Sequence, residues 1–290
     1  MSEKLVEGLK QQGLDLLRTN EPEQAIEIFD EAIAASTDPI LTERLQIHKS
    51  MGRVALEQFD APELKELPKI VLRRRDDTNV YLAAYALAFR FRIEQKLDRA
   101  AHYGKIANET ARSLGRQEWV LDSLTELGNI AVYDSRFADA IRCYGDALDL
   151  LSSDADFRWC FLYQNLGYAR LANGSVEEGI ELIGQALEAM ESTGYTGFIA
   201  ESHLDLALGY LELEQYDLAR QHGRLGLETA TENRQIRNGH YLLGEIAHYS
   251  GDPETAEIHF EHLCRFYPDF PQLKNLLYAI DLRGVINWKL

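Results

Sequence analysis

The feature that most constrains the fold is a spacing of small side chains that recurs along the chain. In the first copy a glycine, Gly13, is followed by Ala25, Phe29 and Ala32, at offsets of 12, 16 and 19 residues. The last three offsets fall on one face of an α-helix. Small residues at offsets 0 and 12 allow two antiparallel helices to approach closely. The spacing therefore predicts a helix, a short turn and a second helix in each copy.

Seven copies of this spacing cover most of the chain, and they begin 36 to 40 residues apart. Their first residues are Gly13, Gly52, Ala88, Gly128, Gly167, Ala207 and Gly244. A helix hairpin cannot bury its apolar face alone, but stacked neighbours bury it together. The repeats therefore predict an all-α fold, an α-solenoid of stacked antiparallel helix hairpins. The second copy is degenerate because Pro62 and Pro68 fall inside its second helix, so we expect a kinked helix or an irregular connector there.

Two turns between the helices of a unit carry helix-start signals. Asp252 before Pro253 is typical of an N-cap followed by proline at the first helical position. Ser175 followed by Glu178 has the S-x-x-E spacing of a capping box. We therefore expect second helices to begin at these two points.

The recurring pattern resembles the tetratricopeptide repeat, which has small residues at its positions 8, 20 and 27 and an aromatic residue at position 24. The resemblance implies a right-handed superhelix, with a repeat array over residues 1–270 and a capping helix and tail over 271–290. The period is longer than the usual 34 residues and resembles that of kinesin light chains and bacterial Rap-type regulators. In the tail, Leu273, Leu276, Leu277 and Ile280 share one helical face, and we expect Trp288 to pack into the cap.

Charge and composition disfavour several classes of partner. The formal net charge is −17, and residues 146–290 carry 23 acidic but only 10 basic side chains. Such a chain repels phosphate backbones and anionic lipids, so we expect neither nucleic-acid nor membrane binding. No apolar run is long enough to span a bilayer, and the start of the sequence lacks the apolar core of a signal peptide. The expected location is the cytoplasm.

The sequence offers little for catalysis, and we expect no catalytic residues, no cofactor and no metal. The three cysteines lack CxxC spacing, which argues against a zinc site or a disulfide framework. Phosphate-loop, dinucleotide and nucleophile-elbow motifs do not occur. His259 and His262 could share a metal in principle, but a hydrogen-bonded or solvated pair is the plainer interpretation. An enzyme subunit is therefore the least favoured function.

The tetratricopeptide resemblance implies that the first helix of each unit lines a groove, with set positions of each repeat pointing into it. On this chain the predicted groove residues are Lys49, Arg53, Tyr85, Phe89, Arg92, Asn129, Tyr133, Gln164, Tyr168, Tyr241, Glu245 and His248, with Glu201, Glu212 and Asn238 at further groove positions. Aromatic side chains are typical anchors of interfaces. Basic positions come early and acidic ones late, which favours a polarised groove that orients a peptide. The alternative is that the aromatic residues pack between helices and the charges only solvate a face.

These features predict a non-catalytic adaptor or scaffold that binds a peptide or helical segment of a partner protein in its groove. A second hypothesis is a peptide-responsive signalling regulator of the Rap-like type, in which peptide binding changes the affinity for another partner. The sequence indicates neither the partner nor the oligomeric state.

Overall fold

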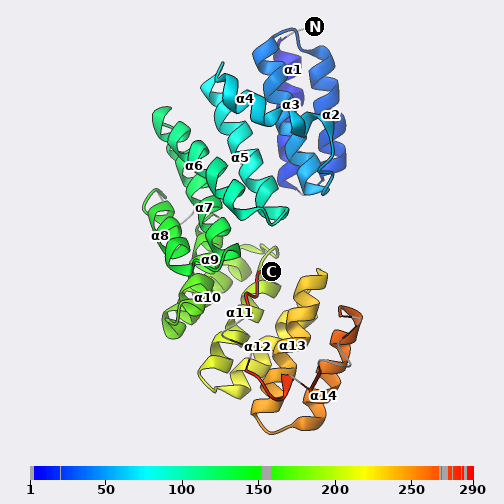
Figure 1. The fold of residues 1–290 in the computed structure, drawn as a ribbon, viewed down its shortest axis with the longest axis vertical. Helices are drawn as coiled ribbons and strands as arrows, with labels where there is room; N and C mark the ends of the chain where they lie inside the picture. The colour runs from blue at the N-terminus through cyan, green and yellow to red at the C-terminus, as the bar shows by residue number, and fades with distance from the viewer. Residues whose placement is uncertain are drawn as a thin grey trace. The chain divides into compact units, whose positions relative to one another are not determined.

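The computed structural model describes residues 3–19, 21–151, 158–267, 269, 274–275, 277–281, 283 and 286–290. These residues form helices and the turns between them, without a strand, which confirms the all-α prediction (Figure 1). The chain divides into two compact units, residues 1–130 and 131–290, here called the N-terminal and C-terminal units. None of the described helices is both long enough and apolar enough to cross a membrane.

The N-terminal unit is a series of helix hairpins. Its helices are α1 (Glu3–Arg18), α2 (Pro22–Ala35), α3 (Pro39–Ala55), α4 (Leu67–Arg73), α5 (Asp77–Ile93), α6 (Leu97–Ser113) and most of α7 (Gln117–Tyr133). In the first hairpin Gly13 lies against Phe29, where an added Cβ would come within 2.6 Å of the ring. Phe29 and Ala32 are fully buried. The small residue of α1 thus makes room for the large one of α2, as the spacing predicts.

The second hairpin of the N-terminal unit is irregular, and its prolines explain why. A 3₁₀ turn at Pro62–Lys65 and the short helix α4 stand where the other units have one long second helix. Pro62 and Pro68 each lie in the first turn of these two elements, where a missing backbone N–H costs nothing. Prolines that would break a long helix therefore start two short ones.

The C-terminal unit continues the hairpins from the end of α7. Its further helices are α8 (Phe137–Leu148), α9 (Arg158–Ala172), α10 (Val176–Thr193), α11 (Ile199–Glu212), α12 (Tyr216–Thr229), α13 (Asn233–Tyr249) and α14 (Pro253–His262). Helices α9 and α10 come together at Gly167 and Gly179. A Cβ on Gly179 would lie 2.7 Å from the Gly167 carbonyl oxygen, so only glycine permits this approach. This contact confirms the role predicted for small residues at offsets 0 and 12.

Both second helices begin where the sequence predicts, but only one of the two predicted capping interactions forms. The Asp252 side chain accepts a hydrogen bond from the Thr255 amide at 3.1 Å, and Pro253 is the first residue of α14. Ser175 is the N-cap of α10 but makes no capping hydrogen bond with its side chain. Glu178 instead lies 3.4 Å from Arg170, so the expected capping box does not form.

Part of the tail, including Leu273 and Leu276, lies outside the described residues. Residues 274, 275 and 277 are helical, and Leu277 is buried. Ile280 is 47% exposed, so it does not share in the packing expected of it. Trp288 is buried, which confirms that it packs. Its packing partner is the inner face of the C-terminal unit, where the candidate site lies.

Candidate functional site

The first helices of three successive hairpins in the C-terminal unit bury polar side chains on one face. These side chains come from α9, α11 and α13 and are Gln164, Ser202, Asp205, Asn238 and Glu245. Buried polar groups require hydrogen-bond partners, because an unpaired one costs about 1–3 kcal/mol. The partners of several of them come from the last residues of the chain.

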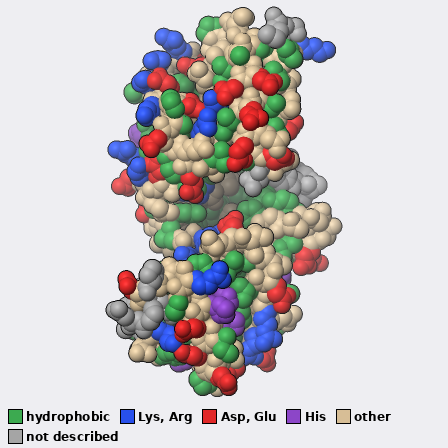
Figure 2. Space-filling view, turned by 90° about the vertical axis from the view of Figure 1, so that its right-hand side faces the viewer, with side chains coloured by type: hydrophobic (Ala, Val, Ile, Leu, Met, Phe, Trp, Pro, Cys, Tyr) green, Lys and Arg blue, Asp and Glu red, His purple; other side chains and the backbone are tan. Residues whose placement is uncertain are grey.

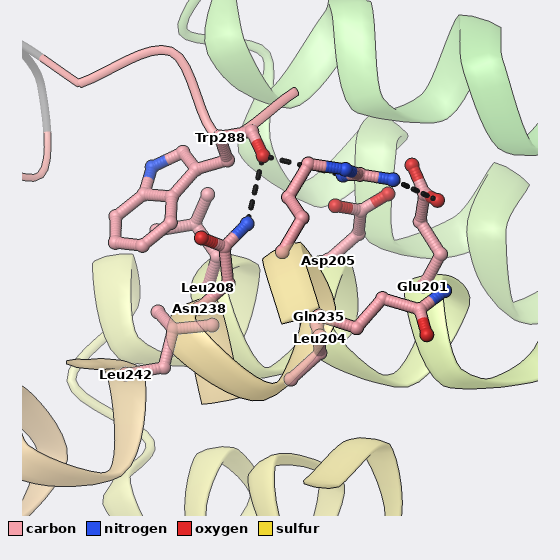
Figure 3. A pocket seen from close by; sticks show the side chains of 9 residues that line it. Glu201, Leu204, Asp205, Leu208, Gln235, Asn238, Leu242 and Trp288 are labelled. Carbon is pink, nitrogen blue, oxygen red and sulfur yellow. Dashed lines mark hydrogen bonds and ion pairs between the residues drawn. The ribbon is translucent and has the colours of Figure 1, made fainter. Parts of the chain in front are cut away.

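The backbone of Trp288 is held on this face from both sides. Its amide donates to the Tyr168 hydroxyl at 3.0 Å, and its carbonyl accepts from Asn238 Nδ2 at 2.8 Å. Figure 3 shows this carbonyl above Asn238, and Arg234 Nη1 donates to the same oxygen at 3.5 Å. The Tyr168 hydroxyl also donates to Asn287 Oδ1 at 3.2 Å. The side chains of this face therefore pair with main-chain groups of the tail.

The next residue, Lys289, brings a charge into the same groove. Its Nζ lies 2.7 Å from Asp205 Oδ2, contacts the Glu201 carboxylate and sits 4.3 Å from the centre of the Tyr168 ring. Lys289 is only 7% exposed, so this is a buried ion pair. Arg234 Nη2 binds Glu201 from the other side at 3.0 Å. The carboxylates of Glu201 and Asp205 are thus paired with one cation from the helices, Arg234, and one from the tail, Lys289.

The two carboxylates respond differently to burial. Burial opposes ionisation of Glu201, but Lys289 and Arg234 outweigh it and hold the pKa of Glu201 below its usual range. Burial raises the pKa of Asp205, and the attraction of Lys289 offsets this only in part. Besides Lys289, Asp205 accepts a hydrogen bond from Gln164 Nε2 at 2.6 Å. Asp205 therefore depends on the tail for its cation, whereas Glu201 keeps Arg234.

The Trp288 side chain fills an apolar part of the groove. It lies against Tyr241, with ring centroids 5.0 Å apart, and close to Leu208 and Leu242 (Figure 3). A small cavity of about 10 Å³ borders Trp288, and its lining includes Leu208, Leu242 and Asp205. A second cavity of about 340 Å³ lies beside the tail. Its lining includes Tyr241, Tyr267 and Leu290. This cavity has room for a further side chain.

Three predicted groove residues of the N-terminal unit surround one buried carboxylate, Glu126. Arg92 Nε donates to Glu126 Oε1 at 2.8 Å, and both side chains are more than 90% buried. The Arg92 guanidinium also lies 5.1 Å from the Phe89 ring centre, and Asn129 Nδ2 is 3.4 Å from Glu126 Oε2. Arg92, Phe89 and Asn129 therefore form a packed cluster within the unit.

The other predicted residues of the N-terminal unit also contact their own unit. Lys49 lies 2.7 Å from Asp30 and 3.5 Å from Glu63, and Arg53 lies 3.1 Å from the same Glu63 carboxylate. Tyr85 is half-buried, and its ring stacks on Tyr81 with centroids 6.0 Å apart. The basic side chains that suggested a polarised groove thus have acidic partners nearby.

Three further predicted residues of the C-terminal unit are Tyr133, His248 and Glu245. Tyr133 is half-buried at the end of α7, and the His248 ring packs edge-on against Tyr278 at 5.3 Å. Glu245 is fully buried on α13, one turn after Tyr241. Burial raises the pKa of Glu245 to about 7, although Arg283 acts against this. Neither Glu245 oxygen has a hydrogen-bond partner among the described residues.

A patch of histidine side chains is visible on the face shown in Figure 2. Within the C-terminal unit, His240 Nδ1 lies 3.1 Å from His259 Nδ1, and the His240 and His262 rings stack 4.1 Å apart. His203 and His222 form a similar contact at 3.0 Å. Within the described part of the chain, no group of three or more His, Cys, Asp or Glu side chains could hold a metal ion. The ring nitrogen of His259 thus lies within hydrogen-bonding distance of His240.

Comparisons with known proteins agree with this helical arrangement. The sequence profile of the tetratricopeptide repeat matches residues 125–189. A crystal structure of a Rap protein complexed with competence and sporulation factor superposes with a TM-score of 0.73, at 14% identity, over 95% of this chain and 80% of that one. The fold of the chain is of the tetratricopeptide-repeat type. No curated protein sequence matches it.

Two further solved structures share this tetratricopeptide-type fold. NprR in complex with its cognate peptide NprX has a TM-score of 0.72, at 14% identity, over 96% of this chain and 84% of that one. The apo form of RapI has a TM-score of 0.68, at 15% identity, over 98% of this chain and 84% of that one. At such low identity these likenesses show the fold alone.

Sequence reasoning missed Asp205 and Arg234 as site residues of this tetratricopeptide-type chain. Glu201 and Asp205 are four residues apart, so they share one face of α11. That i, i+4 pair of acids was a usable signal. The contribution of Lys289 had no such signal, because it lies 84 residues from Asp205.

Proposed function

We propose that this chain is a non-catalytic protein-interaction module that binds a peptide segment on the face of α9, α11 and α13, where residues 287–290 form a turn closed by the Leu290 amide and the Asn287 carbonyl at 3.1 Å. The observation that carries the proposal is that residues 287–289 of the chain lie there as a bound peptide would. Both backbone polar groups of Trp288 are hydrogen-bonded to groove side chains, and its indole is buried in an apolar site. Main-chain pairing with side-chain pockets is how peptides are commonly recognised.

The proposal assigns the binding role to a subset of the predicted groove residues. Gln164, Tyr168 and Tyr241 line the occupied groove, together with Asn238 and Asp205. In the N-terminal unit, Lys49, Arg53 and Arg92 are neutralised by acidic neighbours. Because a paired cation has less to offer a ligand, we assign those residues a structural role.

A second candidate is a regulator that responds to a peptide. Its support is the fold shared with NprR and a Rap protein, whose solved structures are complexes with the NprX peptide and with competence and sporulation factor. In such a regulator the occupied groove would alter binding of another partner elsewhere on the chain. A ligand peptide that changes the affinity for a second protein distinguishes this candidate from a simple adaptor.

The test is a selection of random-sequence displayed peptides on the full chain, performed on wild type and on Lys289→Glu. Selected peptides are then measured by fluorescence anisotropy after Asn238→Ala is added to the Lys289→Glu chain. Because Lys289→Glu has already released the tail, Asn238→Ala in this chain removes only the hydrogen bond to the peptide. We expect at least a tenfold loss of affinity, from one buried hydrogen bond.

Asn173→Ala, an exposed asparagine at the end of α9, is the matched control and should leave the affinity unchanged. Peptides that bind equally well with and without Asn238 would refute a binding site on this face.

A further inference from the structure

The tail contacts identify which features a ligand must have in order to take its place. The main-chain bonds from Tyr168 and Asn238 accept any sequence, since they reach only the amide and carbonyl of Trp288. Selectivity must come from the two side chains that enter the groove, the indole of Trp288 and the ammonium group of Lys289.

The indole site requires an aromatic body but offers nothing to its N–H group. Trp288 is 6% exposed, and its Nε1 has no hydrogen-bond partner among the described residues. A buried donor without an acceptor is unfavourable, while the ring gains from contact with Tyr241 and the neighbouring leucines. Phenylalanine fills such a site without the unpaired donor, so the site accepts phenylalanine as well as tryptophan.

The neighbouring site requires a cation. When Lys289 leaves, Glu201 still has Arg234 at 3.0 Å. The described side chain that still donates to Asp205 is the neutral Gln164, and Arg234 acts on Asp205 only through its charge. A carboxylate left unpaired in a buried position is strongly unfavourable. A ligand that displaces the tail must therefore supply a positive charge in the position directly after its aromatic residue.

We infer that the groove recognises peptides with an aromatic residue followed directly by lysine or arginine, and that residues 287–289 occupy it as a built-in competitor. This inference rests on the proposed function and adds both the ligand class and its regulation to it. The tail is tethered to its site, and tethered segments have effective concentrations on the order of millimolar. A free peptide of the same chemistry therefore binds wild type weakly until the tail is displaced.

The adjoining cavity of about 340 Å³ gives an external ligand an advantage over the tail. Its lining includes Arg237, Leu263 and Tyr267. The tail leaves this volume unfilled, whereas a partner with a large apolar side chain near its aromatic–basic pair can fill it. Burial of that extra area is the means by which a partner outcompetes a tethered segment.

The test measures binding of a fluorescein-labelled, amidated INWKL peptide, the sequence of residues 286–290, to three full-length chains by anisotropy. They are wild type, Lys289→Glu and the charge-matched control Lys69→Glu, which alters an exposed lysine of the N-terminal unit. Glutamate at 289 is repelled by Glu201 and Asp205, so the groove opens. We expect Lys289→Glu to bind INWKL at least tenfold more tightly than wild type or the control. Lys289→Gln serves if Lys289→Glu loses helicity by circular dichroism.

Peptide variants test the ligand class on the opened chain. INFKL should bind at least as well as INWKL, and INWEL at least tenfold more weakly. Equal binding of INWKL to wild type and Lys289→Glu, or equal binding of INWEL and INWKL, would overturn the inference. If displayed peptides without an aromatic–basic pair then bind in an Asn238-dependent manner, the proposed function is supported and the inferred ligand class is wrong. If no binding depends on Asn238, both proposals fail.

Discussion

Both units bury a carboxylate on the face of their first helices, but the two carboxylates obtain their cations from different places. In the N-terminal unit, Glu126 of α7 pairs with Arg92 of α5, the first helix of the preceding hairpin. In the C-terminal unit, Asp205 pairs with Lys289 of the tail. A cation held by a neighbouring helix is part of the scaffold, whereas one held by the tail can be exchanged. The comparison therefore separates an ion pair within the helices from one that includes the tail.

The largest effect that we predict is the loss of the scaffold pair. Arg92→Ala leaves Glu126 buried without its cation and should lower the free energy of unfolding by about 3–5 kcal/mol. Arg142→Ala removes an exposed pair with Asp139 and should cost no more than about 0.5 kcal/mol. Urea unfolding followed by circular dichroism measures both. If Arg92→Ala destabilises the chain as little as Arg142→Ala does, Arg92 is not a fixed partner of Glu126. The contrast between Glu126 and Asp205 would then fail.

A third buried carboxylate, Glu245, sharpens the comparison because it has no cation within the unit at hydrogen-bonding distance among the described residues. Its pKa is about 7 in the folded chain, above the ordinary value of 4.5. The folded chain therefore holds this proton more tightly than the unfolded chain, and stability falls as pH rises from about 4.5 through 7. Glu245→Gln should be more stable than wild type at pH 8 by up to about 3.5 kcal/mol, because the two pKa values differ by about 2.5 and each pKa unit corresponds to about 1.4 kcal/mol.

The Glu245→Gln advantage should nearly vanish at pH 4.5, where the glutamate is protonated in the folded chain and about half protonated in the unfolded chain. Urea titrations at pH 4.5 and 8 provide the measurement. An advantage of equal size at both pH values would mean that the charge of Glu245 is not the cause.

A smaller loss is expected from the exchangeable pair. Lys289→Ala removes the tail cation, but release of the tail lets water reach Asp205, so the cost should be about 1 kcal/mol, well below that of a permanently buried charge. Trp288 then becomes hydrated, and tryptophan emission should shift to longer wavelength. Lys69→Ala should change neither property. A cost equal to that of Arg92→Ala would show that the tail is a fixed part of the core.

The smallest effect concerns the paired histidines. Burial, with the charges of His262, His259 and Arg265, lowers the pKa of His240 to about 4. The folded chain therefore binds a proton at His240 less readily than the unfolded chain does. The stability that results is fully present above pH 6.5 and is lost as pH falls towards 4. His240→Gln should reduce this acid-induced loss by up to about 1 kcal/mol, since His240 is partly exposed. The exposed His102→Gln is the control, and thermal unfolding between pH 5 and 7 gives the comparison.

The repeat architecture was predictable because the recurring small and large side chains determine where two helices can pack closely. Gly13 opposite Phe29, and Gly167 against Gly179, are local consequences of spacing within one hairpin. The groove positions were predictable for the same reason, since helical period fixes the face on which a residue lies. Period does not reveal what covers that face. Gln164 and Tyr168 were therefore assigned to a groove, while the tail segment that fills it was not foreseen.

Local hydrogen-bond geometry was the least predictable feature. The S-x-x-E spacing at Ser175 and Glu178 matched a capping box, yet Glu178 lies near Arg170 instead. The capping box that does form joins Glu232 and Gln235 at the start of α13, where no serine or threonine announces it. Several partners compete for one short side chain, and the sequence alone does not rank them.

The measurement that tests the central claim most directly is hydrogen exchange of the Trp288 backbone amide. It is followed by NMR of ¹⁵N-tryptophan-labelled wild type and assigned with Trp288→Phe. The Tyr168 hydroxyl accepts a hydrogen bond from this amide at 3.0 Å, so we predict that the amide exchanges slowly in the free chain. Saturating INFKL peptide displaces the tail, and the amide should then exchange fast. Fast exchange in the free chain, or slow exchange that saturating peptide leaves unchanged, would contradict a groove held by an exchangeable tail.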